Sequence, residues 1–396
     1  MEKAPSHFDN WERELFENRP TGWKFAKSQF LVDRQVRDVL PTDEIVTVFR
    51  DGEVTLRANR RIEGFTYSEK EIGYHHIEPG DLAIHKMDGG FGAIGISDSA
   101  GKVSPVVNLY RSESFDLRYV AYLLRAAVAT GYIESLQKGI RERSTEFDHA
   151  QFSNFYLLVP PLKTQNHIAD FLDKETSEID ALVGELDGYI ELLEKRKKTY
   201  IKELVSRLPN RMIQLNMLGA MKTGTTPKVI QFDPEGKQWI KPDGLSIEST
   251  GVRIGQDCIS TTNLFPVGTT YICGIGATVG KVGYSSEEAT CNQQITGIIP
   301  NSLVRAKMLF YLVGGITDLL RSTAPRSTLP ILNNVRMGAY KLRVPLLEWQ
   351  DEIIKKIDKE QNRLNLLIHE CRELQSILVK RRQILITDVI TGSKEV

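Results

Sequence analysis

The chain has 396 residues, 41% of them hydrophobic and 26% charged, which is the balance of a folded protein with two or three domains. Lysine and arginine together number 51, as do aspartate and glutamate, so any binding to nucleic acid must depend on local patches. Because no apolar run reaches the ~18 residues of a spanning helix and the N-terminus lacks an apolar signal segment, we expect a cytoplasmic protein with no membrane partner.

The four cysteines are scattered and form no CxxC pair. Their spacing predicts neither a zinc site nor a disulfide framework. We therefore expect reduced, partly buried cysteines, no bound metal and no cofactor.

Residues 1–158 are predicted to form a first mixed α/β domain. Residues 44–57 and 80–87 are short strand-like runs with turn residues around them, whereas residues 117–137 have a helical pattern. Gly90 to Gly95 match GxGxxG, but residues typical of a loop follow, so a dinucleotide site is not expected.

Residues 159–208 are predicted to form a long helix. Apolar residues recur in steps of three, four and seven, which is a heptad-like stripe. Prolines stand only before the stripe, at Pro160 and Pro161, where a missing N–H costs a helix little.

Residues 209–343 contain short strand-like runs separated by turn residues, as the first domain does. Residues 344–396 resemble the first helical segment. Residues 159–206 align without a gap to residues 344–391, an offset of 185 positions that gives 14 identities in 48 positions. The domains also echo each other, in residues 80–97 and 268–285. We therefore predict an α+β fold of two mixed α/β domains separated by two long antiparallel coiled-coil helices, with a pseudo-two-fold internal repeat.

Both helical stripes are interrupted by charge at the same two places. Glu175 and Arg196 in the first copy correspond to Glu360 and Arg381 in the second. In an antiparallel pair Glu175 would face Arg381 and Arg196 would face Glu360, fixing the register. Exposure of all four side chains to solvent is the alternative.

This organisation resembles the specificity subunits of type I restriction-modification enzymes. The helical signature of that family stands as Pro160, Pro161, Leu162, Gln165 and Ile168, and again as Pro345, Leu346, Leu347, Gln350 and Ile353. Residues 223–227 (TGTTP) and 291–295 (CNQQI) also look like stretches common in the recognition domains of the family.

The resemblance implies a non-catalytic subunit of a restriction and adenine methyltransferase complex. Each domain would read one half of a split double-stranded DNA target, while the helices would set the spacing and dock two modification subunits. Restriction subunits would join through the complex.

Contacts to DNA are expected from basic, amide and hydroxyl side chains presented on loops. Residues 57–61 carry three arginines and are the best candidate for a phosphate contact. The candidates in the first domain are Arg57, Asn59, Arg60, Arg61, Lys138, Arg141 and Arg143, and those in the second are Lys222, Thr223, Thr225, Lys281, Arg321 and Arg326.

Two other functions remain open at this stage. One is a non-catalytic coiled-coil scaffold that presents two protein- or ligand-binding modules, which the neutral net charge favours. The other is a DNA-modifying enzyme with an unrecognised active site, although the Asn-Pro-Pro-aromatic signature of adenine methyltransferases is absent from the sequence.

Overall fold

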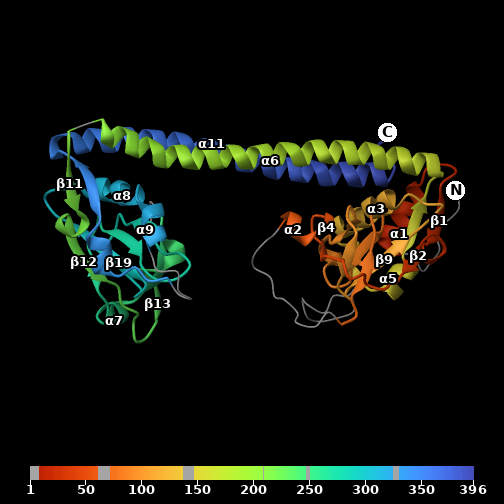
Figure 1. Cartoon of the computed structure of the whole chain (residues 1–396), viewed down its shortest axis with the longest axis horizontal. Helices are drawn as coiled ribbons and strands as arrows, with labels where there is room; N and C mark the ends of the chain where they lie inside the picture. Colours follow the sequence, from red (N-terminus) through yellow and green to blue (C-terminus); the bar gives the residue numbers. More distant parts are fainter. Residues whose placement is uncertain (1–8, 61–71, 137–146, 208, 247–249, 324–329) are drawn as a thin grey trace. The chain divides into compact units, whose positions relative to one another are not determined.

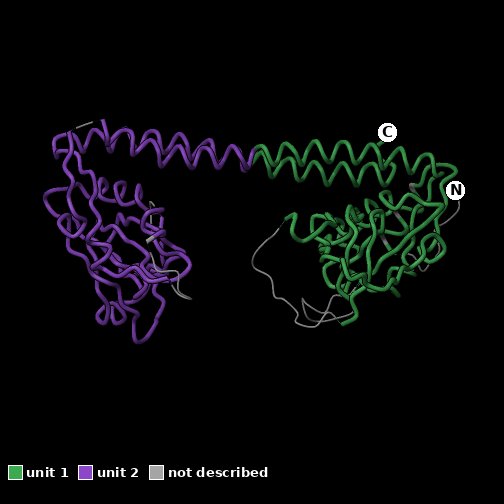
Figure 2. Tube along the Cα trace, in the orientation of Figure 1, with its two compact units in different colours: residues 1–185, 373–396 green, residues 186–372 purple. Residues whose placement is uncertain are grey.

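The computed structural model describes residues 9–60, 72–136, 147–207, 209–246, 250–323 and 330–396. The chain divides into two compact units, residues 1–185 with 373–396 (unit 1) and residues 186–372 (unit 2) (Figure 2). The division falls inside the two long helices. The boundaries that the sequence suggests between domains and helical segments remain proposals.

The globular part of unit 1 combines short strands with short helices (Figure 1). In chain order its elements are α1 (Asn10–Asn18), β1 (Lys24–Lys27), η1 (Ser28–Phe30), β2 (Asp33–Gln35), β3 (Val46–Val48), β4 (Val54–Leu56), α2 (Arg57–Arg60), β5 (His75–Ile77), β6 (Leu82–His85), η2 (Gly89–Phe91), β7 (Ile94–Ile96), β8 (Gly101–Val103), β9 (Val107–Arg111), α3 (Leu117–Ala129), α4 (Tyr132–Ser135), α5 (His149–Asn154) and β10 (Tyr156–Val159).

The globular part of unit 2 follows a related order. Its elements are β11 (Asn210–Gln214), η3 (Leu215–Met217), β12 (Gly219–Thr223), β13 (Phe232–Ile240), η4 (Pro242–Gly244), β14 (Gly251–Ile254), α7 (Gln256–Ile259), β15 (Leu264–Phe265), β16 (Thr270–Cys273), β17 (Val282–Tyr284), β18 (Ala289–Cys291), β19 (Ile295–Pro300), α8 (Ala306–Gly314), α9 (Thr317–Thr323), α10 (Asn334–Gly338) and β20 (Lys341–Pro345).

The two globular parts share one sheet topology. Unit 1 has an antiparallel sheet in the order β2-β9-β6-β7, and unit 2 has one in the order β12-β19-β16-β17. The register repeats as well, because Leu82 pairs with Tyr110 and Thr270 pairs with Ile298, each 188 positions further on. A two-stranded sheet, β1-β10 or β11-β20, precedes each long helix. The predicted duplication of a domain and a helix is confirmed.

The long helices are α6 (Leu162–Ser206) and α11 (Leu347–Ile390), close to the bounds that the heptad pattern predicts. In unit 1, Arg382 pairs with Asp180 at 3.0 Å and Gln375 Nε2 donates to the Val183 carbonyl at 3.2 Å. In unit 2, Gln361 Nε2 donates to the Lys197 carbonyl at 3.3 Å. As the numbers rise along α6 they fall along α11 in unit 1. In unit 2, Leu193, which precedes Lys197, clusters with Leu364 and Ile368, which follow Gln361, so the pair is antiparallel in each unit, as predicted.

The predicted register pairs are wrong. Arg196 pairs with Glu203 on its own helix at 3.1 Å, and Glu360 pairs with Arg363 at 3.4 Å. No ion pair joins Glu175 to Arg381 in the part of the chain that the structure describes. The physical reason is exposure: Arg196 and Arg381 are both exposed, and an ion pair between exposed side chains of two helices would gain little.

A buried glutamine joins each domain to its long helix. Gln165 Oε1 accepts the Asp116 N–H at the start of α3, at 3.0 Å, while its Nε2 donates to the Pro160 carbonyl at 2.8 Å. Gln350 makes the same two bonds, from the Arg305 N–H at 2.7 Å and to the Pro345 carbonyl at 2.9 Å. The glutamine of the helical signature thus has a structural role, holding the start of a domain helix against the start of a long helix.

A second repeated contact lies farther along each helix. Asp173 accepts a hydrogen bond from the Tyr122 hydroxyl and pairs with Arg118, both at 2.8 Å. Asp358 accepts from the Tyr311 hydroxyl and pairs with Lys307 at 2.8 Å. Each globular part is therefore fixed to its own segment of the helix pair, and this fixes the direction in which its surface side chains point.

Candidate functional site

In unit 2, the two tracts that carry the family resemblance lie against each other. Gly224 N donates to the Ile295 carbonyl at 2.8 Å, and Thr225 N donates to the Cys291 carbonyl at 2.9 Å. A Cβ on Gly224 would lie 2.2 Å from the Cys291 carbonyl oxygen, so only glycine permits this approach. The close backbone contact brings residues 223–227 and 291–295 to one surface at the end of β12.

Hydroxyl and amide groups form a hydrogen-bonded network at this surface, which we call the unit 2 polar surface: Thr223, Thr225, Thr226, Asn263, Gln293 and Asn334. Asn334 Nδ2 donates to Thr223 Oγ1 at 3.1 Å and Asn263 Nδ2 donates to the Thr223 carbonyl at 2.8 Å. The Asn263 backbone N–H donates to Thr225 Oγ1 at 3.0 Å, and Thr226 bonds to Gln293. The network holds these side chains in fixed orientations, which is what discrimination of a polar ligand requires.

Cations border the unit 2 polar surface. Lys222 on β12 and Arg336 on α10 are exposed, and neither takes part in an ion pair within the described ranges. Asparagine and glutamine can read base edges, and lysine and arginine can contact phosphates. The arrangement therefore suits a nucleic acid better than a small apolar ligand. Of the predicted candidates, Thr223 and Thr225 belong to this network, and Lys222 is the neighbour of Thr223 on β12.

Lys281 and Arg321 lie elsewhere in unit 2. Both line a cavity of about 460 Å³ that Lys197 and Lys198 of α6 also border. Lys281 Nζ donates to the Asp243 carbonyl at 2.8 Å and Arg321 Nε donates to the Val279 carbonyl at 3.1 Å. These bonds to backbone carbonyls give both side chains a role in stabilising loops.

In unit 1, the described residues of the predicted arginine cluster are tied to their neighbours. Arg60 pairs with Asp51 at 2.7 Å and with Glu53 at 2.9 Å. Arg57 Nε donates to Thr47 at 3.1 Å and Asn59 Nδ2 donates to Thr55 at 2.9 Å. The two carboxylates weaken the local positive potential that the sequence suggests. Arg61, Lys138, Arg141, Arg143 and Arg326 lie outside the described residues.

The repeat identifies a surface in unit 1 that corresponds to the unit 2 polar surface. Gln35 pairs with Leu109 and Lys222 pairs with Gly297, so Gln35 on β2 occupies the position of Lys222 on β12. Arg34 Nη2 donates to Asn108 at 3.1 Å, and Arg37 follows at the end of the strand. We call Arg34, Gln35 and Arg37 the unit 1 polar surface.

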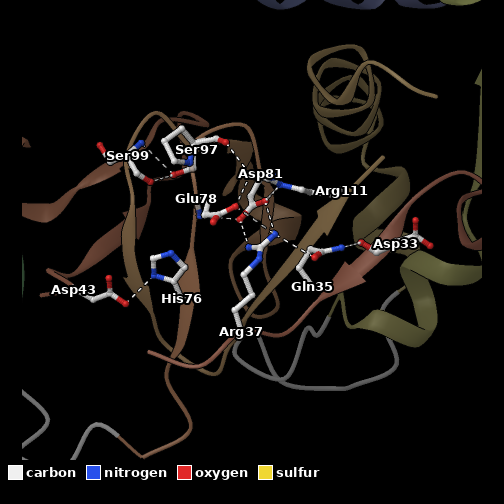
Figure 3. Close-up of polar contacts among 11 residues, drawn as sticks. Asp33, Gln35, Arg37, Asp43, His76, Glu78, Asp81, Ser97, Ser99 and Arg111 are labelled. Carbon is white, nitrogen blue, oxygen red and sulfur yellow. Dashed lines mark hydrogen bonds and ion pairs between the residues drawn. The ribbon is translucent and has the colours of Figure 1, made fainter. Parts of the chain in front are cut away.

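A buried carboxylate holds Arg37 in place (Figure 3). Asp81 is fully buried and receives Arg37 Nη1 at 2.6 Å, Arg111 Nε at 2.5 Å and the Glu78 N–H at 2.8 Å. The hydrogen bond to Asp81 raises the pKa of Arg37 further, so this guanidinium is always charged. Arg37 Nη2 also donates to Gln35 Oε1 at 3.1 Å, which orients the Gln35 side chain.

Sequence reasoning missed Arg34, Gln35 and Arg37 because no motif marks them. The available signal was the echo between residues 80–97 and 268–285, whose offset of 188 positions also relates β9 to β19 and the strands paired with them. Subtracting that offset from the number of Lys222 gives a position next to Gln35.

In the described ranges, no three His, Cys, Asp or Glu side chains converge on a metal-sized site. The four cysteines are free and buried, and burial raises the pKa of the Cys291 thiol. Among helices of the described residues, none is both long and apolar enough to cross a bilayer.

The comparisons with known proteins agree with this architecture. A family model described as the type I restriction modification DNA specificity domain matches residues 211–376. The chain is 25% identical over 213 residues to the type I restriction enzyme EcoR124I/EcoR124II specificity subunit of Escherichia coli, covering 50% of this chain and 52% of that protein. It therefore spans about half the length of this curated relative.

Two further matches run almost the full length of the chain. A protein of Methanocaldococcus jannaschii described as a type I restriction enzyme MjaX specificity subunit is 23% identical over 410 residues, covering 90% of this chain and 94% of the relative. A chain solved in work on complex assembly and conformational transition of the type I R-M system has a TM-score of 0.73 at 14% identity, covering 95% of this chain and 99% of the other.

Fold and surfaces together define a class of protein in which two small α+β domains alternate with two long antiparallel helices. Residues 211–376 match the type I restriction modification DNA specificity domain, and the chain is similar to specificity subunits of type I restriction enzymes.

Proposed function

We propose that this chain is the specificity subunit of a type I restriction-modification system, that it binds a bipartite double-stranded DNA target, with the unit 1 and unit 2 polar surfaces each contacting one half, and that it is not itself catalytic. The observation that carries the proposal is the repeat of an entire domain, including its sheet register and its buried glutamine contact. Two DNA-binding domains with the same fold, each fixed to the antiparallel helices, suit a DNA target of two half-sites separated by a spacer of constant length. Helix length then determines the spacing.

Within each DNA-binding domain, some side chains contact phosphates and others contact bases. Lys222, Arg336 and Arg37 contact phosphates, and Gln293, Asn263 and Gln35 reach base edges. Thr223, Thr225 and Asn334 hold the unit 2 amides in position. The cluster from Arg57 to Arg61 is an additional phosphate contact, with Arg57 as its main described contributor.

Exposed apolar residues on the helices support the docking of two methyltransferase subunits. Tyr189 and Leu192 on α6 are 47% and 63% exposed, and their repeat equivalents on α11, Leu374 and Ile377, are 46% and 59% exposed. Apolar side chains that recur at equivalent positions form two copies of one patch, which suits two copies of one protein partner. Restriction subunits join through that complex.

A salt-dependent DNA-binding assay on the chain with its methyltransferase subunits tests the DNA-binding proposal. Removing the two cations in a Lys222→Ala/Arg336→Ala variant should weaken binding to all sequences and lower the slope of log K against log salt by about 2. The control is Lys355→Ala/Lys359→Ala, which removes two exposed charges of α11. Absent or salt-insensitive binding by the unmodified complex would favour the scaffold function instead.

A further inference from the structure

An N-terminal helix covers one face of unit 1. Helix α1 begins with a capping box in which Asp9 and Glu12 exchange backbone and side-chain bonds. Trp11 and Leu15 are buried in the core cluster that contains Leu157 of β10 and Ile386 of α11. Phe16 packs edge-on against Phe25 of β1, with ring centroids 5.7 Å apart. An amphipathic helix thus covers the small sheet and the adjoining end of a long helix.

Among the residues of unit 2 that the structure describes, no helix occupies the equivalent place. Helix α6 ends at Ser206 and β11 begins at Asn210, so the linking residues are too few to form a counterpart of α1. The face holds instead a groove of about 360 Å³ lined by Ile201, Val205, Met212, Leu312 and Leu342.

The groove residues are the repeat equivalents of residues in the unit 1 core. Ile201 corresponds to Ile386 and Val205 to Ile390, both 0% exposed, while Ile201 and Val205 are 8% and 4% exposed. Met212 corresponds to Phe25, which Phe16 covers, yet Met212 is 58% exposed. The face is therefore covered by α1 in unit 1, whereas in unit 2 its two helix residues are buried at the floor of the groove and Met212 is exposed.

The rim of the groove is basic. Lys202, Lys341 and Arg343 line it, are exposed, and form no ion pair with any residue that the structure describes. Their equivalents in unit 1 are Thr387, Tyr156 and Leu158, which carry no charge. The basic residues thus stand at the rim of the face that has no covering helix, and uncharged residues stand at the equivalent positions of the covered face.

We propose that the groove of unit 2 binds an acidic amphipathic α-helix of a protein partner in the manner in which α1 covers unit 1. The bound helix carries large apolar residues at the spacing of Trp11, Leu15 and Phe16. Segment 9–19 of this chain shows the required chemistry, because its sequence combines four acidic and two basic residues with these apolar residues. Helix-in-groove binding needs this combination of apolar anchors and a complementary rim. The site is additional to the proposed DNA surfaces and does not depend on them.

A fluorescent peptide of residues 9–20 is the probe, titrated against the full chain and followed by anisotropy. We expect saturable binding that weakens with salt, and a binding constant at least about tenfold poorer in both Met212→Glu and Lys341→Glu/Arg343→Glu. These substituted side chains are exposed, so the variants should fold, and thermal unfolding verifies it. The matched control, Lys355→Glu/Lys359→Glu, should bind as the unmodified chain does.

A photoreactive group at the Phe16 position of the peptide locates the site. Crosslinks to residues 201–216 or 338–343 support the proposal. Crosslinks confined to unit 1, equal binding by the groove variants, or equal binding of a scrambled peptide would overturn it. So would the absence of saturable binding. A dimer of the chain that the peptide dissociates would assign the groove to a second copy and likewise overturn the assignment to a partner.

Discussion

At the scale of single residues, the most informative side chains are the two glutamines of the helical signature. Gln165 and Gln350 are 2% and 0% exposed, and each uses both ends of its amide to join a domain helix to a long helix. A buried amide with this pattern of bonds cannot be replaced by an apolar residue without leaving backbone groups unsatisfied. The glutamine of the signature therefore joins a domain helix to a long helix.

Gln350→Ala should destabilise the protein by on the order of 2–4 kcal/mol, because it leaves the Arg305 N–H and the Pro345 carbonyl without partners. Urea unfolding measures the loss. The control is Gln256→Ala, at an exposed position of α7, which should change the free energy of unfolding by less than about 0.5 kcal/mol. Similar losses in the two variants would show that the glutamine contact is not stabilising.

Tyr122 should make stability depend on alkaline pH. Burial raises the pKa of its hydroxyl to about 12. In the unfolded chain the pKa of a tyrosine is about 10. The folded state holds the proton more tightly, so this contribution is complete below pH about 10 and is lost as pH rises towards 12. Between pH 8 and 11 the free energy of unfolding should fall less in Tyr122→Phe than in the unmodified chain; an equal fall contradicts the assignment.

At the scale of elements, the helix pair depends on an apolar seam, and its charges contribute less. Leu193, Leu364 and Ile368 form a buried cluster in unit 2. The heptad pattern predicted both the helices and their direction, because apolar periodicity is a property of the sequence itself. It did not predict the ion pairs, because a long exposed side chain such as Arg196 can reach carboxylates on either helix with little difference in energy.

Two adjacent leucines of α6 test this account. Leu193 is 7% exposed and Leu192 is 63% exposed. Leu193→Ala should therefore cost about 2–4 kcal/mol of unfolding free energy through the cavity that it leaves, and Leu192→Ala less than about 0.5 kcal/mol. Chemical denaturation of both variants makes the comparison, and equal costs would mean that the seam lies elsewhere.

At the scale of the whole molecule, duplication is the organising fact. It was readable from the 185-residue offset of the helical segments, and the mixed α/β character of the domains was readable from their strand and turn residues. The residues of the candidate sites were harder to predict from the sequence. Arg37 depends on the buried Asp81, and the unit 2 polar surface depends on the contact of Gly224 with Cys291. Contacts between segments far apart in the chain produce no periodic pattern, so a single sequence does not predict them.

The two docking patches should be independent of each other. Leu192→Asp and Ile377→Asp each place a charge in one patch, and both side chains are exposed, so the fold should persist. Native mass measurement of the assembly should show two methyltransferase subunits on the unmodified chain and one on either variant. The double variant should carry none. Retention of both subunits by the double variant would remove the helices as the docking site.

The most direct test of two independent DNA-binding domains is sequencing of the methylated sites in a host that carries the complete complex. The unmodified chain should yield one motif of two specific halves around a nonspecific spacer. A Gln293→Ala variant, altered in unit 2 alone, should relax one half and leave the other half and the spacer unchanged. A single contiguous motif, or relaxation of both halves together, would contradict the account.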